Sequence, residues 1–283
     1  MISGTAFAKI NFGLRVGSRR PDGFHPVDGI FQSVNLADRL TLTGAEHDTI
    51  GTSGGASVLE GRNNLAFKAV AAVREHAGSS RPVAVTLDKS IPHASGLGGG
   101  SADAAIALVI AGLFFDVQPD VLANIAPQLG SDVPFCLQGG TARVAGRGEA
   151  VVRMDPLEGF SLGLVVPPVD VSTPEVFAAW DDLNEPEGLR SPASGLPPSL
   201  RGEGELVNDL YPASIAVAPA VDDWRQELES RWGRLVMLSG SGPSLFGFFL
   251  DGDEAEDAIG IAPKGARLAE AIDLSPVGWA VAD

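Results

Sequence analysis

The stretch IPHASGLGGGSADAA, residues 91–105, places a run of glycines directly before an alanine-rich apolar segment. Glycine costs conformational entropy on folding, so the run Gly98-Gly99-Gly100 indicates a structural requirement for glycine. Such a requirement is a positive φ angle or a backbone that approaches a ligand closely. The unpaired N–H groups and the positive dipole at the start of a helix bind phosphate without any side-chain charge. The stretch therefore predicts either a phosphate-binding loop or a tight strand-to-helix connection.

Three better-known glycine motifs do not match this loop. A Walker A loop needs a lysine after its second glycine, but Ser101 and Ala102 follow Gly100. The dinucleotide-binding pattern requires glycine at position 101. The nucleophile elbow G-x-S-x-G fails at Ser101 and also at Ser241. A glycine loop at a helix N-terminus is the pattern that remains.

The composition is that of a globular protein, and its negative charge disfavours polyanionic partners. The chain has 283 residues, which is enough for one large domain or two packed ones. Hydrophobic residues make up 45% and charged residues 20%, so a sizeable core is expected. A formal net charge of −16 argues against nucleic acids and anionic membranes as partners. An anionic small ligand needs a local positive site.

Metal clusters and export signals are not predicted. Cys136 is the single cysteine, and the four histidines are scattered, so we expect no metal site built from protein side chains. The longest apolar run, residues 104–115, is shorter than the ~18 residues of a membrane span. The start, MISGTAFAKIN, lacks the pattern of a signal peptide. A cytoplasmic location is therefore expected.

Residues 6–16 alternate between apolar and other side chains, which predicts a strand with one buried face. Lys9 and Asn11 share the opposite face and point the same way. The segment RRPDGFH at 19–25 has the chemistry of a turn. A strand at about 38–42 and a helix at about 64–76, with Asn64 as its N-cap, come next.

A strand at 83–87 leads into the glycine loop, and a helix follows from about Ser101 to Phe115. Ser101 is expected to cap this helix, with Asp103 in its first turn. A second short helix after Asp116 and a hairpin ending at about residue 153 complete this part. A compositional change near Pro156 predicts domains at 1–155 and 156–283.

The second part of the chain repeats the mixture of strands and helices. A strand is expected at 162–166, and the capping-box spacing of Ser172 and Glu175 predicts the start of a helix. The segment 181–206, with its Pro, Gly and Ser, is interpreted as a mobile surface loop or an insertion. Two strands around the turn Gly240-Ser241-Gly242 and a final helix follow.

Five segments occur in an order and spacing that resemble one family: FAKINFGL, RPDGFH, IPHASGLGGGSADAA, LGSDVPF and LSGSGPSLFG. The chain resembles the GHMP kinases, from about residue 5 to about residue 250, and LVNDL at 206–210 is similar to their linker. The departures are Phe24 in place of tyrosine, Ala94-Ser95-Gly96 in place of GAG, and Ser131 in place of alanine.

The resemblance implies a two-domain α+β fold, with a ribosomal-protein-S5-like N-terminal domain, a ferredoxin-like C-terminal domain and an active site between them. It also implies that ATP, with Mg²⁺, phosphorylates the 2-hydroxyl of 4-(cytidine 5′-diphospho)-2-C-methyl-D-erythritol, in non-mevalonate isoprenoid biosynthesis. The implied partner is this small molecule, and the implied assembly is a monomer or homodimer. Two alternatives are a GHMP kinase for another small alcohol, such as homoserine or mevalonate, and a non-catalytic ATP-binding sensor.

The resemblance assigns the chemistry to two residues that, taken singly, could be ordinary surface or turn residues. Asp132 would accept or orient the proton of the acceptor hydroxyl, and Lys9 would stabilise the developing charge. Phe24 would stack on the cytosine ring, and His25 would hydrogen-bond to its polar edge.

The other implied contacts follow the same motifs. The triphosphate would lie against Pro92, His93, Ala94, Ser95, Gly96, Leu97, Gly98, Gly99, Gly100, Ser101 and Ala102. The adenine end would lie near Asn64, Leu65 and Lys89. The acceptor pocket would include Asn11, Phe31, Thr173, Pro174 and Phe177. For Phe31 and Phe177, a place in the hydrophobic core is the alternative.

Overall fold

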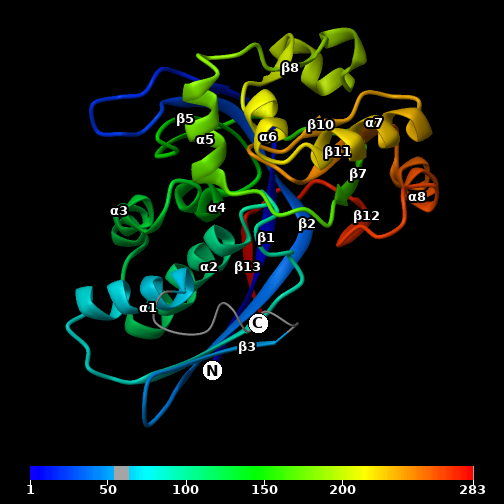
Figure 1. The fold of residues 1–283 in the computed structure, drawn as a ribbon. Coiled ribbons are helices and arrows are strands. Elements are labelled where there is room, and N and C mark those ends of the chain that lie inside the picture. The colour runs from blue at the N-terminus through cyan, green and yellow to red at the C-terminus, as the bar shows by residue number, and fades with distance from the viewer. Residues whose placement is uncertain (54–63, 283) are drawn as a thin grey trace.

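The computed structural model describes residues 1–53 and 64–282. Within these ranges, nine strands form one sheet, in which the long antiparallel pair β1 and β2 is central (Figure 1). The main path of the sheet is β3-β4-β2-β1-β9-β8, while β13 pairs with β1 and β5 joins β2 to β6. Its strands are β1 Ile2–Val16, β2 Val27–Gly44, β3 Thr49–Ser53, β4 Val83–Asp88, β5 Thr141–Gly146, β6 Ala150–Arg153, β8 Leu189–Ser191, β9 Leu206–Asn208 and β13 Trp279–Val281.

A second sheet has four strands in the order β10-β11-β7-β12. Its strands are β7 Ser161–Val166, β10 Met237–Leu238, β11 Leu245–Phe249 and β12 Leu268–Ile272. The helices are α1 Leu65–His76, α2 Gly99–Phe115, α3 Pro119–Leu129, α4 Val133–Gln138, α5 Thr173–Asp182, α6 Tyr211–Val217, α7 Ala220–Trp232 and α8 Gly252–Gly260, with short 3₁₀ turns η2 Ala193–Gly195 and η3 Pro198–Glu203.

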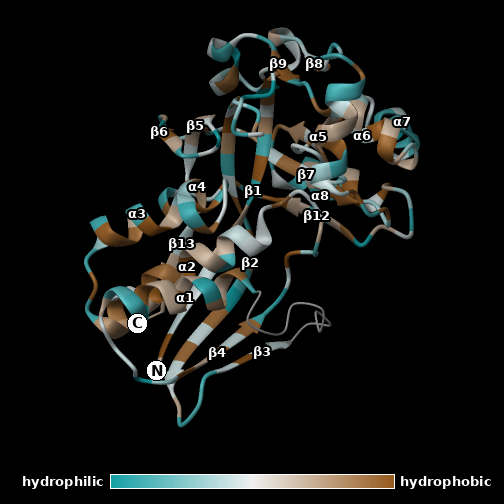
Figure 2. Ribbon diagram, turned by 60° about the vertical axis from the view of Figure 1, so that its left-hand side comes forward, coloured by the Kyte–Doolittle hydropathy of each residue, from teal (hydrophilic) through white to brown (hydrophobic). Residues whose placement is uncertain are grey.

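Helices α1 to α4 cover one side of the first sheet (Figure 2). The apolar helix α2 is the centre of this layer, because its residues from Ala104 to Ala111 are all at most 8% exposed. Burying such a helix against strands and neighbouring helices is the main source of stability in a two-layer domain. In the described ranges, no helix is both long and apolar enough to cross a bilayer.

Strand β1 has the predicted buried face. Ala8, Ile10 and Phe12 are fully buried, as the alternation of the sequence requires. The opposite face is also enclosed, because Lys9 is 6% exposed and Asn11 is 2% exposed. These polar side chains therefore do not lie on a solvated face of the sheet.

The prediction for β2 was too short, because the strand begins at Val27 and not near Asp38. Residues 29–34 are all buried. A strand that is covered on both faces shows no alternation of polar and apolar residues, so the periodicity of the sequence missed this half of it.

Helix α1 and strand β4 confirm their predictions, and the Asn64 side chain accepts a hydrogen bond from the Ala66 N–H at 2.8 Å as an N-cap. Helix α2 begins two residues earlier than predicted. It begins at Gly99, with Gly98 as N-cap at φ 69°, and makes no side-chain cap bond. Ser101 therefore does not cap the helix, and Asp103 lies beyond the first turn.

Helix α5 begins where predicted, but the expected capping interaction is not formed, because the Ser172 side chain makes no cap hydrogen bond. The segment 181–206, predicted to be a mobile surface loop or an insertion, has more regular structure than a surface loop. This segment contains β8, two 3₁₀ turns and the start of β9, and it buries Leu196 and Leu200 at 2% and 0% exposure. These two leucines anchor a segment whose Pro, Gly and Ser content resembles that of a surface loop.

The two sheets are interleaved along the chain. Strands β8, β9 and β13 come after Pro156 yet belong to the first sheet, and all four strands of the second sheet also come after it. Gly4 in β1 pairs with Val281 in β13, which brings the two ends of the chain together (Figure 1). The domain boundary at 155/156 stays a prediction.

Candidate active site

A cavity of about 850 Å³ lies where the glycine loop, strand β1, helix α5 and the turn at 19–25 meet. Every residue of the predicted site lines it, with one exception. Ala102 is fully buried and belongs to the hydrophobic core around α2, so its side chain does not contribute to the cavity wall. Motifs that lie between residues 7 and 247 of the sequence therefore converge on one cavity.

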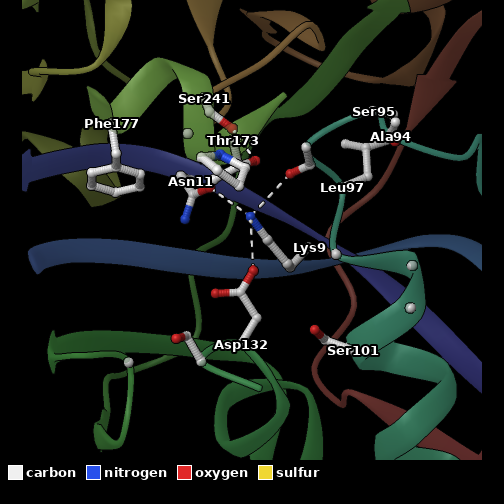
Figure 3. Close-up of a pocket in the computed structure, with 18 of the residues that line it drawn as sticks. Lys9, Asn11, Ala94, Ser95, Leu97, Ser101, Asp132, Thr173, Phe177 and Ser241 are labelled. Atoms are coloured by element: carbon white, nitrogen blue, oxygen red, sulfur yellow. Dashed lines mark hydrogen bonds and ion pairs between the residues drawn. The ribbon is translucent and has the colours of Figure 1, made fainter. Parts of the chain in front are cut away.

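Lys9 and Asp132 face each other at the centre of this cavity (Figure 3). Their Nζ and Oδ2 atoms are 3.4 Å apart. The Lys9 ammonium also donates to Asn11 Oδ1 at 2.7 Å and to the Gly96 carbonyl at 2.9 Å. Three acceptors surround a buried cation, which compensates for its loss of water and fixes its position.

Asp132 is held in the turn that starts α4. It is the N-cap residue of that helix but makes no side-chain cap bond. Its carboxylate is turned instead toward Lys9 and is 31% exposed. A carboxylate that is partly open to the cavity and fixed by a lysine can accept a proton from a bound hydroxyl group.

The glycine loop leads directly into the N-terminus of α2. Gly98 has a φ of 69°, and the first intrahelical bond runs from the Ala102 N–H to the Gly98 carbonyl at 2.8 Å. The N–H groups of residues 99–101 precede that bond, as the orphan donors of a helix start do. A Cβ atom on Gly98 would lie 2.8 Å from Lys9 Cγ, so the loop needs glycine here to fit against the lysine.

A second glycine turn supports the first. Gly96 has a φ of 79°, and a Cβ atom there would lie 2.7 Å from the Gly242 carbonyl oxygen. The Ser95 carbonyl accepts hydrogen bonds from the Ser244 hydroxyl at 2.6 Å and from the Ser244 N–H at 3.1 Å. Ala94, which replaces glycine of the family pattern, adopts a left-handed φ of 49°. The shape of the loop thus follows from its neighbour as well as from its own glycines.

Lys89 lies beside the loop, but its charge is already compensated. It forms buried ion pairs with Asp38 and with Asp103, the latter at 2.5 Å. Burial alone lowers the pKa of Lys89, but the two carboxylates outweigh this effect and raise it. Asp38 also accepts the N–H groups of Ser90 and Ile91 at 2.7 and 2.9 Å. This cluster fixes the junction between β4 and the glycine loop, and the two carboxylates compensate the positive charge of Lys89 within the protein.

In this cluster, Asp103 has an unusually high pKa. Burial raises the pKa of Asp103 to about 7, although the Lys89 charge opposes the shift. Within the described part of the chain, its Oδ1 atom makes no hydrogen bond. A carboxyl group in such surroundings holds a proton at a pH where an exposed aspartate is ionised.

The aromatic end of the cavity is formed by the turn at 19–25 and by α5. Phe24 is 46% exposed, and the Arg147 guanidinium lies 3.9 Å from the centroid of its ring. The His25 ring stacks on Phe177, with centroids 5.3 Å apart and planes inclined by 25°. An exposed ring and a stacked pair of rings in one wall form a surface that suits a flat heterocycle.

Both ring nitrogens of His25 already have protein partners. The Nδ1 atom is 3.1 Å from the Gly17 carbonyl oxygen, and the Nε2 atom is 3.4 Å from Asp181 Oδ2. A contact between the His25 ring and a base edge would require one of these partners to be released. The predicted reading of the cytosine edge by His25 therefore stays a prediction.

Two further groups suit a polar acceptor. The Thr173 and Ser241 hydroxyls are 2.8 Å apart beside Lys9 (Figure 3). Asn11 turns its Nδ2 atom away from Lys9, and this buried atom makes no hydrogen bond in the described residues. Phe31 has a double role, because it packs against Phe135 in the core and lies 5.4 Å below the Lys9 ammonium.

Several residues of the cavity were missed at the level of sequence. They include Arg19, Asp103, Ser131, Arg147, Asp181 and Ser241. A signal existed for two of them, because Arg147 lies between the glycines of the hairpin GRG and Ser241 lies within the second glycine turn. The predicted loop 181–206 includes Asp181, but α5 continues to Asp182, so Asp181 lies one turn after Phe177 on the same face.

Comparison with known proteins connects this site to one family. The family model described as GHMP kinases N terminal domain matches residues 64–140. A 4-diphosphocytidyl-2-C-methyl-D-erythritol kinase from Moorella thermoacetica is 38% identical over 259 residues, which cover 88% of this chain and 90% of that protein. The protein of the same name from Pelotomaculum thermopropionicum is 37% identical over 281 residues, with 96% of each chain covered.

Solved structures agree with the sequence relatives. A crystal structure of 4-(cytidine 5′-diphospho)-2C-methyl-D-erythritol kinase matches with a TM-score of 0.78 and 31% identity, covering 95% of this chain and 98% of that one. A homoserine kinase from Cytophaga hutchinsonii has a TM-score of 0.72 at 18% identity over 99% of this chain and 97% of that one, which shows a shared fold. The predicted two-domain α+β architecture is thereby confirmed. The chain belongs to the GHMP kinases, in the family of 4-diphosphocytidyl-2-C-methyl-D-erythritol kinases.

Proposed function

We propose that this protein transfers the γ-phosphoryl group of ATP to the 2-hydroxyl of 4-(cytidine 5′-diphospho)-2-C-methyl-D-erythritol. The observation that carries the proposal is the pair Lys9 and Asp132, 3.4 Å apart, at the point where the glycine loop meets the acceptor side of the cavity. Phosphoryl transfer needs positioned phosphates, compensation of charge and an oriented hydroxyl group, and this arrangement has a candidate for each.

In the proposed arrangement, the triphosphate lies against the N-terminus of α2. The backbone N–H groups of residues 99–101 donate to its oxygens, and the helix dipole favours its charge. The glycines matter because their lack of side chains lets phosphate approach the backbone. The adenine end would lie beside the start of α1, where the Leu65 side chain is close to the glycine loop, 3.7 Å from the position of a Cβ atom on Gly100.

Mg²⁺ fits this cavity as a companion of the triphosphate. Among the described residues, no group of three or more His, Cys, Asp or Glu side chains could hold a metal ion alone. Mg²⁺ usually takes one or two protein oxygens together with substrate phosphates. Ser101 and Asp132 present such oxygens at the cavity wall. The ion would supply compensation for the negative charge of the phosphates.

The acceptor hydroxyl would lie between Asp132 and Lys9. Asp132 takes the hydroxyl proton, the oxygen forms its bond to the γ-phosphorus, and the bond from that phosphorus to the β-bridging oxygen breaks to release ADP. Lys9 donates to the developing alkoxide. Asn11 holds Lys9 in place through its Oδ1 atom and offers its Nδ2 atom to the acceptor.

The cytidine would occupy the aromatic end of the cavity, next to Phe24 and Phe177. Homoserine and mevalonate carry no ring to stack there, so this wall favours the cytidylated acceptor over either of them.

Steady-state ADP release tests the proposal directly. With ATP and Mg²⁺, the purified protein should turn over the cytidylated acceptor and leave homoserine and mevalonate unchanged. Removal of Mg²⁺ by a chelator should abolish turnover. Comparable turnover of homoserine or mevalonate would assign the protein to another acceptor, and ATP binding without turnover of any acceptor would make it a sensor.

A further inference from the structure

Helix α5 presents one face to the cavity. Thr173, Pro174, Phe177, Ala178 and Asp181 all line it, at the spacing of successive helical turns. The first members of this series belong to the predicted acceptor pocket. Asp181, at the far end, was not predicted, and neither the family resemblance nor the chemistry of phosphoryl transfer requires a carboxylate there.

The position of Asp181 is unfavourable for the helix itself. It lies in the last turn of α5, where the helix dipole is negative, and that turn contains no basic residue. A carboxylate at a helix C-terminus is repelled by the unpaired carbonyl groups. Asp181 must therefore be compensated by contacts outside its own helix.

The compensation comes from the turn at 19–25. Asp181 Oδ2 lies 3.4 Å from His25 Nε2 and 3.9 Å from Arg19 Nη1. His25 is only 6% exposed, whereas Asp181 is 33% exposed and Arg19 is 63% exposed. The His25 contact is thus the sheltered one, and the Arg19 contact is open to solvent and screened.

Two acceptors fix the orientation of the His25 ring. The Gly17 carbonyl faces Nδ1 at 3.1 Å, and the Asp181 carboxylate faces Nε2 at 3.4 Å. Because these contacts lie at the two nitrogens of the ring, they restrain its rotation. The ring stacks on Phe177 at an inclination of 25° and is nearly perpendicular to Trp180, whose ring centroid is 5.4 Å away.

We infer that Asp181 is a positioning residue for the acceptor site. It acts through His25, whose ring it holds flat against Phe177, and so it fixes the wall on which the cytidine lies. A hydrogen bond from the Ser18 hydroxyl to Glu185 Oε1 at 2.5 Å also joins the residue before this turn to the chain beyond α5. The inference rests on the proposed placement of the cytidine at this end of the cavity.

Kinetics of Asp181→Ala test the inference, with Asp182→Ala as the matched control. Asp182 is the neighbouring carboxylate on the same helix end, is exposed and does not line the cavity. Asp181→Ala should raise the KM for the acceptor by roughly 2- to 150-fold, the range that coupling energies of about 0.5–3 kcal/mol between residues in contact imply. The KM for ATP and kcat should stay within about twofold of wild type, because a remote contact that is equal in ground and transition states sets KM alone.

A double-mutant cycle shows whether Asp181 acts through His25. If it does, His25→Ala/Asp181→Ala should have an acceptor KM within about twofold of that of His25→Ala alone. Independent effects that multiply would overturn the inference. So would an acceptor KM in Asp181→Ala that equals the Asp182→Ala value, or one that falls because a negative charge near the acceptor diphosphate has been removed. Failure of wild type to use the cytidylated acceptor would instead overturn the proposed function and this inference together.

Discussion

Replacement of Gly98 by alanine separates the two reasons why the glycine loop contains this glycine. The first is conformational, because the φ of Gly98 is 69° and L residues pay a penalty in that region. The second is steric, because the new Cβ atom would lie 2.8 Å from Lys9 Cγ and 3.1 Å from Lys9 Cε. Only the second reason touches the catalytic lysine.

The two effects have different sizes and different readouts. The left-handed conformation should lower the free energy of unfolding by roughly 1–2 kcal/mol. To restore an ordinary carbon–carbon separation of ~3.5–4.0 Å, the Lys9 stem must move by roughly 0.7–1.2 Å. A displacement of about 1 Å at a reacting group costs on the order of 10² in rate. We therefore expect kcat of Gly98→Ala to fall by about two orders of magnitude.

Gly233→Ala is the matched control. Gly233 has a similar φ of 62° at the C-cap of α7, and a Cβ atom there would have nothing within 4 Å. Chemical denaturation should show a similar loss of stability in both variants, whereas ADP release should be impaired in Gly98→Ala alone. The reasoning would be refuted by a Gly98→Ala enzyme with wild-type kcat, or by an equal loss of kcat in Gly233→Ala.

Three further predictions concern the catalytic pair, the aromatic wall and the buried cluster. Asp132→Asn should lower kcat by roughly 10²–10⁴-fold without changing the circular dichroism spectrum, and adding Lys9→Ala should cost little more, because groups that act as a unit are not additive; multiplying losses in the kinetics would contradict this. Phe24→Leu should raise the acceptor KM by roughly 5- to 150-fold, the equivalent of losing base stacking, with ATP KM unchanged and Phe24→Tyr close to neutral; an unaltered acceptor KM would remove Phe24 from the pocket. Burial raises the pKa of Asp103 to about 7, so its stabilising contribution is present near pH 4 and is lost as the pH rises through about 7. Between about pH 5 and pH 8, urea unfolding should therefore show that wild type loses stability relative to Asp103→Asn. An equal pH response of both proteins would argue against the shift.

The sequence predicted those features whose signals are local. The alternation around Lys9 and Asn11 predicted which face of β1 carries them, and Asn64 marked the start of α1, because a strand face and an N-cap each depend on a few neighbouring residues. The order of the five family motifs predicted the fold, and all but one of the residues that it assigned to the site line one cavity. Their roles there stay predictions.

What the sequence could not predict depends on distant partners. Lys89 reads as a free cation near a phosphate loop until Asp38, on β2, is seen to pair with it. The first half of β2 is buried on both faces, so it lacks a period, and Leu196 and Leu200 turn an apparent surface loop into a packed segment. In each case a tertiary contact overrides the local pattern.

The charges around the cavity explain why the glycine loop, and not a set of basic side chains, has to bind the triphosphate in the proposed function. Lys9 is compensated by Asp132, and Lys89 by Asp38 and Asp103. The two arginines of the cavity lie at its aromatic end, Arg19 beside Asp181 and Arg147 over the Phe24 ring. A chain with a net charge of −16 repels a second anion at long range. Backbone N–H groups at the start of α2 carry partial positive charge that no carboxylate of the protein has to balance, and they are fixed before the ligand arrives. Loop glycines that expose this backbone should therefore matter more for ATP binding than any single cation of the cavity wall.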